Sequence, residues 1–264
     1  MSISFENRCR NLVVELGLGT AEEVESIVPL TGGVSSDIAR ITINNREICV
    51  KFALAKLKVA EEWVADVTRN KAEYQWLSFV SSVVPTAVPA LLGSSDTLNG
   101  FAMEFVDGEG VYLWKTALLE ARPAEDEAVK VGHVLGRIHQ QSSVSQTIHG
   151  QFQNSEDFFS LRLEPYLLFT ATHHPGLVTE ISEIVKMVTN NQFVLVHGDV
   201  SPKNIMFRHG EPIFLDAECA TMGDPGFDVS FCLNHLILKA VHLKTSRDWL
   251  LGSVAKLWSS YKSH

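Results

Sequence analysis

One stretch of the chain, residues 194 to 218, constrains the fold more than any other. It reads VLVHGDVSPKNIMFRHGEPIFLDAE, in which two short apolar runs, 205–207 and 213–215, flank a polar segment that contains a glycine. Two such runs around a glycine-containing turn predict a β-hairpin. Because a hairpin folds back on itself, Asn204 at its entrance comes close to Asp216 at its exit. The stretch therefore predicts an amide and a carboxylate side by side at one end of a two-stranded ribbon.

The residues around this hairpin have the types and the spacing that phosphoryl transfer uses. The interval from Asp199 to Asn204 equals that of H-R-D-x-x-x-x-N in kinase catalytic loops, with Gly198 in place of the arginine. In such loops one carboxylate orients the attacking hydroxyl group, and an Asn and a second Asp hold Mg²⁺ against the nucleotide phosphates. A turn and a strand cap would explain each residue alone, but not His197, Asp199, Asn204 and Asp216 together. We predict Asp199 as the catalytic base and Asn204 and Asp216 as metal ligands.

Three motifs in this region carry a resemblance to a known family. HGDxxxxN at 197–204 is followed by LDxE at 215–218 and by DPGFD at 224–228. This pattern resembles the aminoglycoside phosphotransferase and choline kinase family, which consists of small-molecule kinases with a protein-kinase-like fold. The resemblance covers most of the chain. It implies that Asp228 braces the catalytic loop by accepting hydrogen bonds from backbone N–H groups, and that Glu218 has either a place near the metal or a structural role.

The resemblance also implies a fold class and a division into lobes. We expect an α+β, bilobal protein-kinase-like fold, with a β-rich nucleotide-binding lobe over residues 1–105 and a mainly helical lobe over residues 106–264. The helical lobe holds the catalytic loop and the acceptor site in this prediction. The nucleotide is ATP or GTP, together with Mg²⁺. In many relatives further helices follow the segment that corresponds to the end of this chain, so the resemblance implies a short C-terminus here.

The first lobe contains a glycine-rich loop between two strand-like segments. Residues 26–30, 37–43 and 47–53 are rich in β-formers, and the loop TGGVSS joins the first two. In kinase-like folds such a loop covers the nucleotide phosphates, because glycine and serine let backbone N–H groups approach an anion. A simple hairpin turn is the alternative. The residues that we predict to bind the phosphates are Gly32, Gly33, Ser35 and Ser36.

Lys51 lies on the third of these segments, among small residues. Strand alternation places Ile48, Val50 and Phe52 on one face and Lys51 on the other. This placement indicates a lysine held in a cleft, and the alternative is a charged residue that protects an edge strand. The resemblance implies that Lys51 binds the nucleotide phosphates and pairs with a glutamate on the next helix.

The helical pattern over residues 61–80 offers Glu61, Glu62 and Glu73 as this partner. We predict Glu73, because the residues around it match the acidic position of the family, one turn before an apolar pair. Residues 50–77 also resemble methylthioribose kinases, which carry a similar tryptophan-containing insert. Glu62 stays open as an alternative, and a solvent-exposed helix face would explain either glutamate without a role in binding.

A strand-like segment over residues 101–105 leads into an acidic, glycine-rich segment. The resemblance implies that this segment is the hinge that binds adenine through its backbone, and a simple linker is the alternative. We predict that Glu104 and Val106 supply these backbone groups and that Met103 lines the adenine pocket.

The composition excludes several classes of partner. The chain carries 22 basic and 31 acidic residues, for a net charge of −9, whereas a nucleic-acid-binding face needs clustered Lys and Arg. The N-terminus lacks a signal pattern and no apolar run approaches membrane-spanning length, so we expect a cytoplasmic protein without a membrane partner.

The four cysteines show no C-x-x-C pairing, which indicates neither a metal site nor a disulfide framework. Nothing in the sequence indicates an oligomeric state.

The segment between Asp216 and Asp228 is too short for a peptide-binding platform. Protein kinases use a long segment here, which ends in A-P-E and supports the peptide. In this chain it has only eleven residues, 217–227, and its glycines and proline favour a tight turn. We therefore predict that the acceptor is a hydroxyl group of a small molecule. The segments expected to build its pocket are helical: 155–171, 175–190 and 229–241.

The identity of the acceptor stays open among aminoglycosides, other antibiotics, choline-like amines, sugars and amino alcohols. Glu156, Asp157 and Glu164 would give the pocket a negative lining that suits amines, and a solvent-exposed helix face is the alternative for each. Two other functions are a methylthioribose-kinase-like sugar kinase and a catalytically silent nucleotide-binding module. The intact catalytic and metal-binding positions argue against the silent module.

The remaining segments carry local signals. Ser4 can cap a helix over residues 5–16, and Thr20 to Glu23 have the capping-box spacing that predicts a short second helix. Further along, the pattern predicts a strand over 88–92, helices over 111–120, 124–141 and 156–171, and a polar loop over 142–154.

Overall fold

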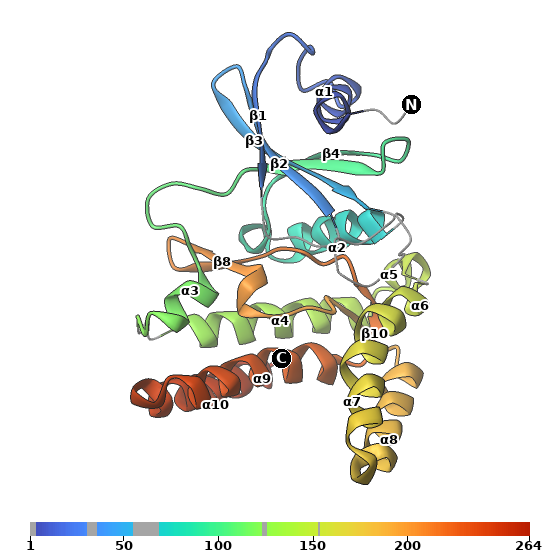
Figure 1. The fold of residues 1–264 in the computed structure, drawn as a ribbon, viewed down its shortest axis with the longest axis vertical. Helices are drawn as coiled ribbons and strands as arrows, with labels where there is room; N and C mark the ends of the chain where they lie inside the picture. Colours follow the sequence, from blue (N-terminus) through green and yellow to red (C-terminus); the bar gives the residue numbers. More distant parts are fainter. Residues whose placement is uncertain (1–3, 31–35, 55–68, 123–125, 153) are drawn as a thin grey trace. The chain divides into compact units, whose positions relative to one another are not determined.

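The computed structural model describes residues 4–30, 36–54, 69–122, 126–152 and 154–264. The chain divides into two compact units, one made of residues 1–78 and 89–107 and the other of residues 79–88 and 108–264. The first unit contains an antiparallel β-sheet and the second is mainly helical, as Figure 1 shows. These elements confirm the predicted α+β class. The predicted lobe boundary between residues 105 and 106 stays a prediction.

The first unit is built on a five-stranded sheet with the order β1-β2-β3-β5-β4. Its strands are β1 Val24–Leu30, β2 Ser36–Ile43, β3 Arg46–Ala53, β4 Leu91–Ser95 and β5 Gly100–Glu104. The turn between β2 and β3 has Asn44 and Asn45 at φ +49° and +58°, a left-handed pair that asparagine tolerates and that suits the twist of a hairpin. The three strands predicted around the glycine-rich loop are therefore confirmed.

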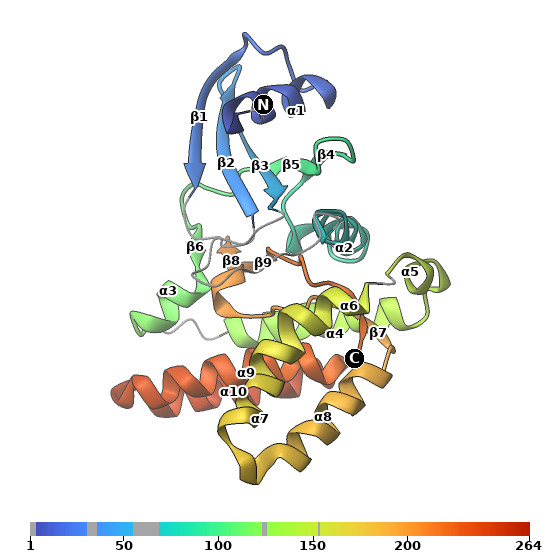
Figure 2. The same cartoon turned by 45° about the vertical axis from the view of Figure 1, so that its right-hand side comes forward.

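Helix α1, Phe5–Glu15, covers one face of this sheet (Figures 1 and 2). Ser4 caps it, because its side chain accepts a hydrogen bond from the backbone N–H of Asn7. The buried side of α1 packs with the strand face predicted from alternation, which includes Val50 and Phe52. The α1 prediction is thus confirmed, and this apolar packing holds β3, the strand of Lys51, in place.

The predicted second helix does not form. Thr20 and Glu23 make both bonds of a capping box, from Thr20 N to Glu23 Oε2 at 2.8 Å and from Glu23 N to Thr20 Oγ1 at 3.3 Å. The chain nevertheless enters β1 at Val24, which is buried and pairs with Ile43. A capping box stabilises a helix end only when a helix follows, and here burial in the sheet outweighs the local signal.

The predicted strand over 88–92 is displaced toward the C-terminus. Residues Pro85–Ala87 form a 3-10 turn, and β4 begins only at Leu91. Pro89 has no N–H group to donate to a ladder, so the strand starts beyond it.

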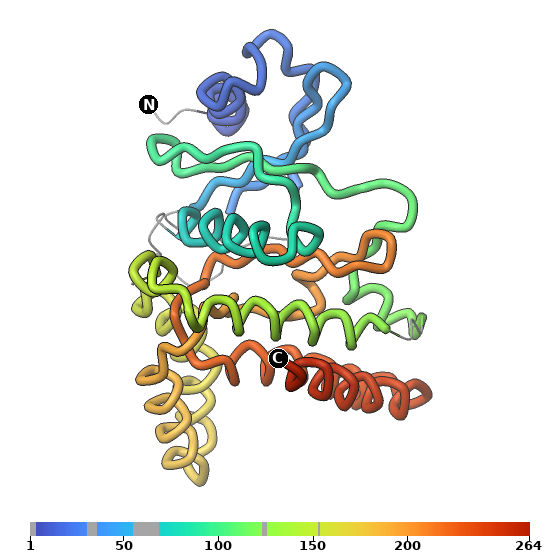
Figure 3. The backbone as a smooth tube through the Cα atoms, turned by 180° about the vertical axis from the view of Figure 1, so that it is seen from behind, coloured from blue at the N-terminus to red at the C-terminus, as the bar shows by residue number. Residues whose placement is uncertain are grey.

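The second unit has a layer of long helices beneath a set of short strands. Its elements are β6 Tyr112–Leu113, α3 Trp114–Leu119, α4 Glu127–Ser143, α5 Gln146–Gln151, α6 Ser155–Phe158, η2 Phe159–Leu168, α7 Phe169–His173, α8 Val178–Asn190, β7 Val194–Val196, β8 Ile205–Arg208, β9 Glu211–Phe214, β10 Thr221–Gly223, α9 Pro225–His242 and α10 Arg247–Tyr261. Helix α10 packs against both α4 and α9 (Figures 2 and 3). No helix in the described ranges is both long enough and apolar enough to cross a membrane.

Two local predictions in this unit are wrong in part. The helix predicted over 111–120 begins only at Trp114, because Tyr112 pairs with Phe207 of β8 and stacks on its ring at 5.5 Å between centroids. The polar loop predicted over 142–154 contains α5, which is capped by Ser145 and buries Ile148. In both segments the burial or packing of apolar side chains, which a local pattern does not show, accompanies the difference from the prediction.

The helix predicted over 156–171 forms, but its middle is a π-helix. This segment, η2, contains Pro165. Proline removes a backbone donor and crowds the preceding turn of an α-helix, and a wider turn accommodates it. The same segment carries Arg162, which is buried.

Helices α4 and α10 approach each other most closely at Gly132. A Cβ atom at this position would lie 2.4 Å from the carbonyl oxygen of Leu257 and 3.2 Å from the backbone N of Tyr261. Only glycine therefore fits at this point of contact, because the neighbouring atoms belong to backbone that cannot rotate away.

We expect Gly132→Ala to lower the free energy of unfolding by about 1–3 kcal/mol, the usual effect of overpacking a tight contact. The matched control is Gly252→Ala on α10, where a Cβ would meet no atom within 4 Å. That control should raise stability by about 0.5–1 kcal/mol through helix propensity alone. Urea denaturation measures the free energy of unfolding of both variants. Equal stability of the two variants would contradict the close packing of α4 against α10 at Gly132.

Candidate functional site

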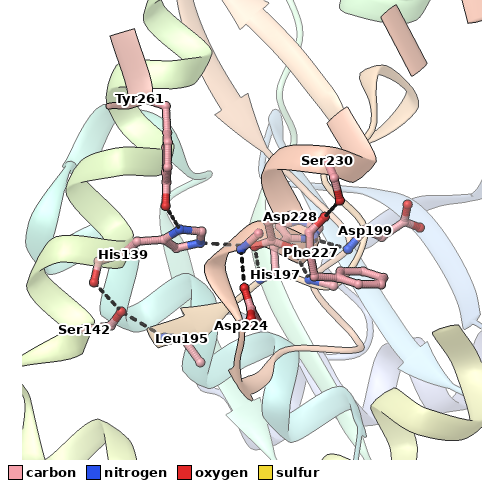
Figure 4. Close-up of polar contacts among 12 residues, drawn as sticks. His139, Ser142, Leu195, His197, Asp199, Asp224, Phe227, Asp228, Ser230 and Tyr261 are labelled. Atoms are coloured by element: carbon pink, nitrogen blue, oxygen red, sulfur yellow. Dashed lines mark hydrogen bonds and ion pairs between the residues drawn. The ribbon is translucent and has the colours of Figure 1, made fainter. Parts of the chain in front are cut away.

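The loop that contains His197, Gly198 and Asp199 is held by the carboxylate of Asp228. This carboxylate is fully buried in the first turn of α9 and accepts hydrogen bonds from the backbone N of His197 at 2.6 Å and of Gly198 at 2.8 Å. Gly198 has φ +79°, and a Cβ there would lie 2.9 Å from the carbonyl oxygen of Cys219, so the turn requires glycine. The predicted brace is therefore confirmed (Figure 4).

Helix α4 supports Asp228 and the strand that precedes the loop. His139 Nε2 lies 3.3 Å from Asp228 Oδ2, and His139 Nδ1 lies 3.0 Å from the hydroxyl of Tyr261. Ser142 Oγ accepts a hydrogen bond from Leu195 N in β7 at 2.9 Å. As Figure 4 shows, these contacts connect α4, α9 and α10 to the start of the loop, so the packing of the helices fixes the loop.

The imidazole of His197 joins the loop to the segment after the hairpin. Its Nδ1 accepts a hydrogen bond from the backbone N of Asp199 at 3.1 Å, and its Nε2 lies 3.0 Å from the carbonyl oxygen of Leu215. This pattern assigns the ring proton to Nε2 of a neutral imidazole. Burial lowers the pKa of His197 despite the nearby carboxylates, which agrees with that state. His197 thus has a structural role.

The hairpin of β8 and β9 places Asn204 next to the segment of Asp216. Its turn has His209 and Gly210 at φ +52° and +76°, and the backbone N of Leu215 donates to the carbonyl oxygen of Asn204 at 2.9 Å. Asn204 Nδ2 donates to the carbonyl oxygen of Asp199 at 3.1 Å, which leaves its Oδ1 as the acceptor atom. An amide oxygen and the half-buried carboxylate of Asp216 are the oxygen donors that Mg²⁺ prefers.

The carboxylate of Asp199 is oriented by two cations. Its Oδ2 lies 3.0 Å from Arg162 Nη2 and 3.1 Å from Lys203 Nζ. Arg162 Nε also donates to the carbonyl oxygen of Gly198 at 2.6 Å. Burial alone would lower the pKa of Lys203, but the charge of Asp199 raises it, so the lysine is charged. Within the described part of the chain, the buried Oδ1 of Asp199 has no hydrogen-bond partner.

Arg162 is a site residue that the sequence analysis missed. It lies 37 residues before Asp199, on a helix that the catalytic motifs do not include. The available signal was a single arginine between Leu161 and Leu163, which are both buried. A charged residue that breaks an apolar helix face generally has a buried partner.

In the first unit, Lys51 Nζ lies 2.6 Å from Glu73 Oε2, and both side chains are almost completely buried. Glu73 belongs to α2, Arg69–Val83. This helix is tied to the strands by Asn70, whose Nδ2 donates to the carbonyl oxygen of Asn99. The structure therefore places Lys51 against the predicted glutamate, while Glu61 and Glu62 lie outside the described residues.

The other predicted nucleotide-binding residues of this unit are described in part. Gly32, Gly33 and Ser35 lie outside the described residues, and Ser36 is the buried first residue of β2. Met103 is buried in β5. Glu104 ends that strand, and its backbone N donates to the carbonyl oxygen of Ala90 at 2.8 Å. Val106, the last of the predicted set, follows β5 and is half-buried.

The predicted residues thus form one group in each unit. In the first unit Lys51 meets Glu73. In the second unit, the Asn204 side chain donates a hydrogen bond to the carbonyl oxygen of Asp199. Asn204 also lies beside the segment of Asp216, because its carbonyl oxygen accepts a hydrogen bond from Leu215 N. The four cysteines are free and buried, and the described residues contain no group of three or more His, Cys, Asp or Glu side chains that would hold a metal.

Comparison with known proteins identifies the family. The model of the phosphotransferase enzyme family (APH) matches residues 26–242. A methylthioribose kinase of Bacillus velezensis is 24% identical over 97% of this chain and 72% of its own length. A Bacillus cereus methylthioribose kinase is 23% identical, and the chain spans only 63% of that protein.

Solved structures show the same fold. A choline/ethanolamine kinase family protein from Mesorhizobium loti has a TM-score of 0.63 at 13% identity, over 98% of this chain and 75% of its own. The streptomycin–ATP ternary complex of APH(2″)-IIa has a TM-score of 0.50 at 17% identity, over 99% of both chains. The predicted kinase-like fold and the predicted class of small-molecule kinase are confirmed. The chain therefore belongs to the phosphotransferase enzyme family.

Proposed function

We propose that this chain transfers the γ-phosphoryl group of Mg·ATP to a hydroxyl group of a small molecule, with Asp199 as the base. The observation that carries this proposal is the state of the Asp199 carboxylate. Arg162 and Lys203 hold its Oδ2, and its Oδ1 has no hydrogen-bond partner among the described side chains and backbone groups. A carboxylate that is oriented in this way has one oxygen left to accept the proton of a hydroxyl group.

The remaining residues have roles in holding the nucleotide and the metal. Lys51, which Glu73 orients, would bind the phosphates together with the glycine-rich loop. Asn204 and Asp216 would hold Mg²⁺. When bound, Mg·ATP supplies the phosphoryl group, and the metal offsets the negative charge on the phosphate oxygens. Support for ATP as the donor comes from the ATP complex of APH(2″)-IIa.

One backbone group of Glu104 is not available to bind adenine. The backbone N of Glu104 already donates to Ala90 within the first unit. Its part in binding adenine would therefore fall to its carbonyl group. Val106 would supply the N–H group, and Met103 would contact the ring.

A small-molecule acceptor is supported by the segment between Asp216 and Asp228. It turns at Glu218 and Cys219, pairs with β7 through β10, and enters α9 at Pro225. Residues that pair with a neighbouring strand cannot at the same time form an extended platform for a peptide.

A methylthioribose-kinase-like sugar kinase is the second candidate. It is favoured by the curated relatives, one of which matches 97% of the chain. The silent binding module is the weaker alternative, because burying both Lys51 and Glu73 costs desolvation free energy that a mere binding fold has no reason to retain. Measuring the release of ADP from ATP, or of GDP from GTP, over a panel of aminoglycosides, choline-like amines, amino alcohols and methylthioribose distinguishes the three.

We expect Asp199→Asn to lower kcat by about 10²–10⁴-fold, the range of a general base, and to leave ATP affinity almost unchanged. The asparagine keeps the size of the side chain but cannot accept the proton. Steady-state kinetics with an acceptor that the protein phosphorylates measure kcat, and titration calorimetry measures the affinity for ATP. A kcat close to that of the unmodified protein would overturn the assignment of the base.

Asp216→Ala should remove the Mg²⁺-dependent part of nucleotide binding, since the metal loses its carboxylate ligand. Calorimetry with ATP in the presence of Mg²⁺ or of EDTA measures this part. Equal Mg²⁺ dependence in the variant and the unmodified protein would show that Asp216 is not a ligand.

Arg162→Met should lower kcat by about 10–100-fold, which corresponds to one lost charge-assisted hydrogen bond of about 1.5–3 kcal/mol. The KM for ATP should stay the same, because Arg162 contacts the base and its neighbour Gly198 and none of the residues proposed to bind the nucleotide. Arg162→Lys keeps the charge and should restore part of kcat, whereas a purely structural role would be visible in the melting temperature alone. Glu164→Gln, an exposed position on the same helix, is the control. An unchanged kcat in a folded Arg162→Met protein would exclude this role.

A further inference from the structure

Basic side chains gather beside Asp199 on three elements of the second unit. We call Lys115, Lys203, His235 and Lys239 the basic cluster. Lys203 belongs to the 3-10 turn Pro202–Asn204, against which α3, the helix of Lys115, packs. His235 and Lys239 lie one turn apart on α9, and Lys239 Nζ donates to the carbonyl oxygen of His235 at 3.4 Å.

The members of the basic cluster are close enough to act on one another. The charges of Lys239, Asp199, Lys203 and Lys115 all influence His235, and that of Lys115 also influences Lys239. Burial lowers the pKa of both His235 and Lys239, and the neighbouring lysines lower it further. His235 is therefore neutral at pH 7, and its ring adds a hydrogen-bonding group among the lysines.

The basic cluster has more positive charge than the carboxylates around it can neutralise. Asp199, whose charge acts on His235, already binds Arg162 and Lys203. Asp216, which also acts on Lys203, is the proposed metal ligand. Lys239 is only 9% exposed, and within the described ranges its Nζ contacts the carbonyl oxygen of His235 and forms no ion pair with a carboxylate. A buried ammonium without a counter-ion is costly.

The excess of positive charge in the basic cluster contrasts with the net charge of the whole chain, which is −9. Lys115 and Lys203 are exposed, whereas Lys239 is buried. A like charge close to a buried ammonium lowers the stability of a fold, and such groups commonly mark a binding site. An anion bound among Lys115, His235 and Lys239 would remove the repulsion and supply the missing counter-charge.

An aromatic surface adjoins the basic cluster. The ring of Phe231 lies 5.1 Å from that of His235 and 5.7 Å from that of Tyr166, measured between centroids. Tyr166 is 52% exposed. An acceptor that approaches Asp199 along α9 would thus meet apolar rings beside the lysines.

We propose that the basic cluster binds an anionic group of the acceptor, a carboxylate or a phosphate ester, while the hydroxyl group of the same molecule faces Asp199. This inference rests on the proposed phosphotransferase function. It assigns a negative charge to the acceptor. A pocket lined by Glu156, Asp157 and Glu164 would instead suit a positively charged amine. Glu156 instead lines a separate cavity of about 200 Å³ with Thr189 and Met222, and Glu164 is exposed.

The test measures anion binding directly and does not depend on turnover. The full chain is saturated with Mg·AMP-PNP, so that the nucleotide fills its own phosphate site, and is then titrated with inorganic phosphate, succinate or spermidine. The ring signals of His235 in NMR spectra report binding at the basic cluster. A Lys115→Gln/Lys239→Met double variant removes two charges and keeps most of the aliphatic stems, and Lys186→Gln, exposed on α8, is the control.

We expect phosphate or succinate to shift the His235 signals, and the double variant to weaken this binding by at least about tenfold. The control should bind as the unmodified protein does. Tighter binding of phosphate indicates a phosphate ester in the acceptor, and tighter binding of succinate indicates a carboxylate. A shift caused by spermidine alone, no shift with either anion, or equal anion affinity in the double variant would overturn the proposal. Failure of AMP-PNP to bind would contradict the proposed function, and the titration of the free protein would still test the basic cluster.

Discussion

The buried carboxylate of Asp228 accepts hydrogen bonds from two consecutive backbone amides, those of His197 and Gly198, and the geometry of the catalytic loop depends on it. Without this acceptor both N–H groups would be buried and unsatisfied, at a cost of about 1–3 kcal/mol each. The left-handed turn at Gly198 comes directly before Asp199. The position of the proposed base is thus set by the first turn of α9 and by His139 of α4, which contacts Asp228 and is itself held by Tyr261 of α10.

From this anchor, hydrogen bonds reach Asp199 and Asn204 and extend to Leu215, the neighbour of Asp216. The imidazole of His197 joins Asp199 to Leu215, and Asn204 joins the same loop to the exit of the hairpin. Arg162 adds a contact from a distant helix and holds both Asp199 and the carbonyl group of Gly198. Preorganisation of this kind lets a base act without rearrangement during the reaction. In the basic cluster, Lys203 contacts the same carboxylate, and His235 and Lys239 lie on α9.

Sequence patterns predicted the parts of this arrangement that local interactions determine. The hairpin of β8 and β9 follows from two short apolar runs around a glycine-containing turn, whereas the role of Asp228 was implied by the family resemblance. Arg162 was missed because its partner is 37 residues away, and β6 because a two-residue strand has no period. The capping box at Thr20 forms without a helix, since burial of Val24 in the sheet decides that segment. Pairing of Lys51 with Glu73 depended on a family resemblance, because several glutamates had suitable spacing.

The central claim is that the chain moves a phosphoryl group from Mg·ATP to a small-molecule hydroxyl group. Phosphorus NMR of the full chain with ATP, Mg²⁺ and a mixed panel of neutral, cationic and anionic alcohols tests it most directly. The account predicts a new phosphomonoester signal that grows in step with ADP and is absent when Mg²⁺ is removed. Formation of inorganic phosphate alone, or unchanged ATP signals with every acceptor, would contradict it.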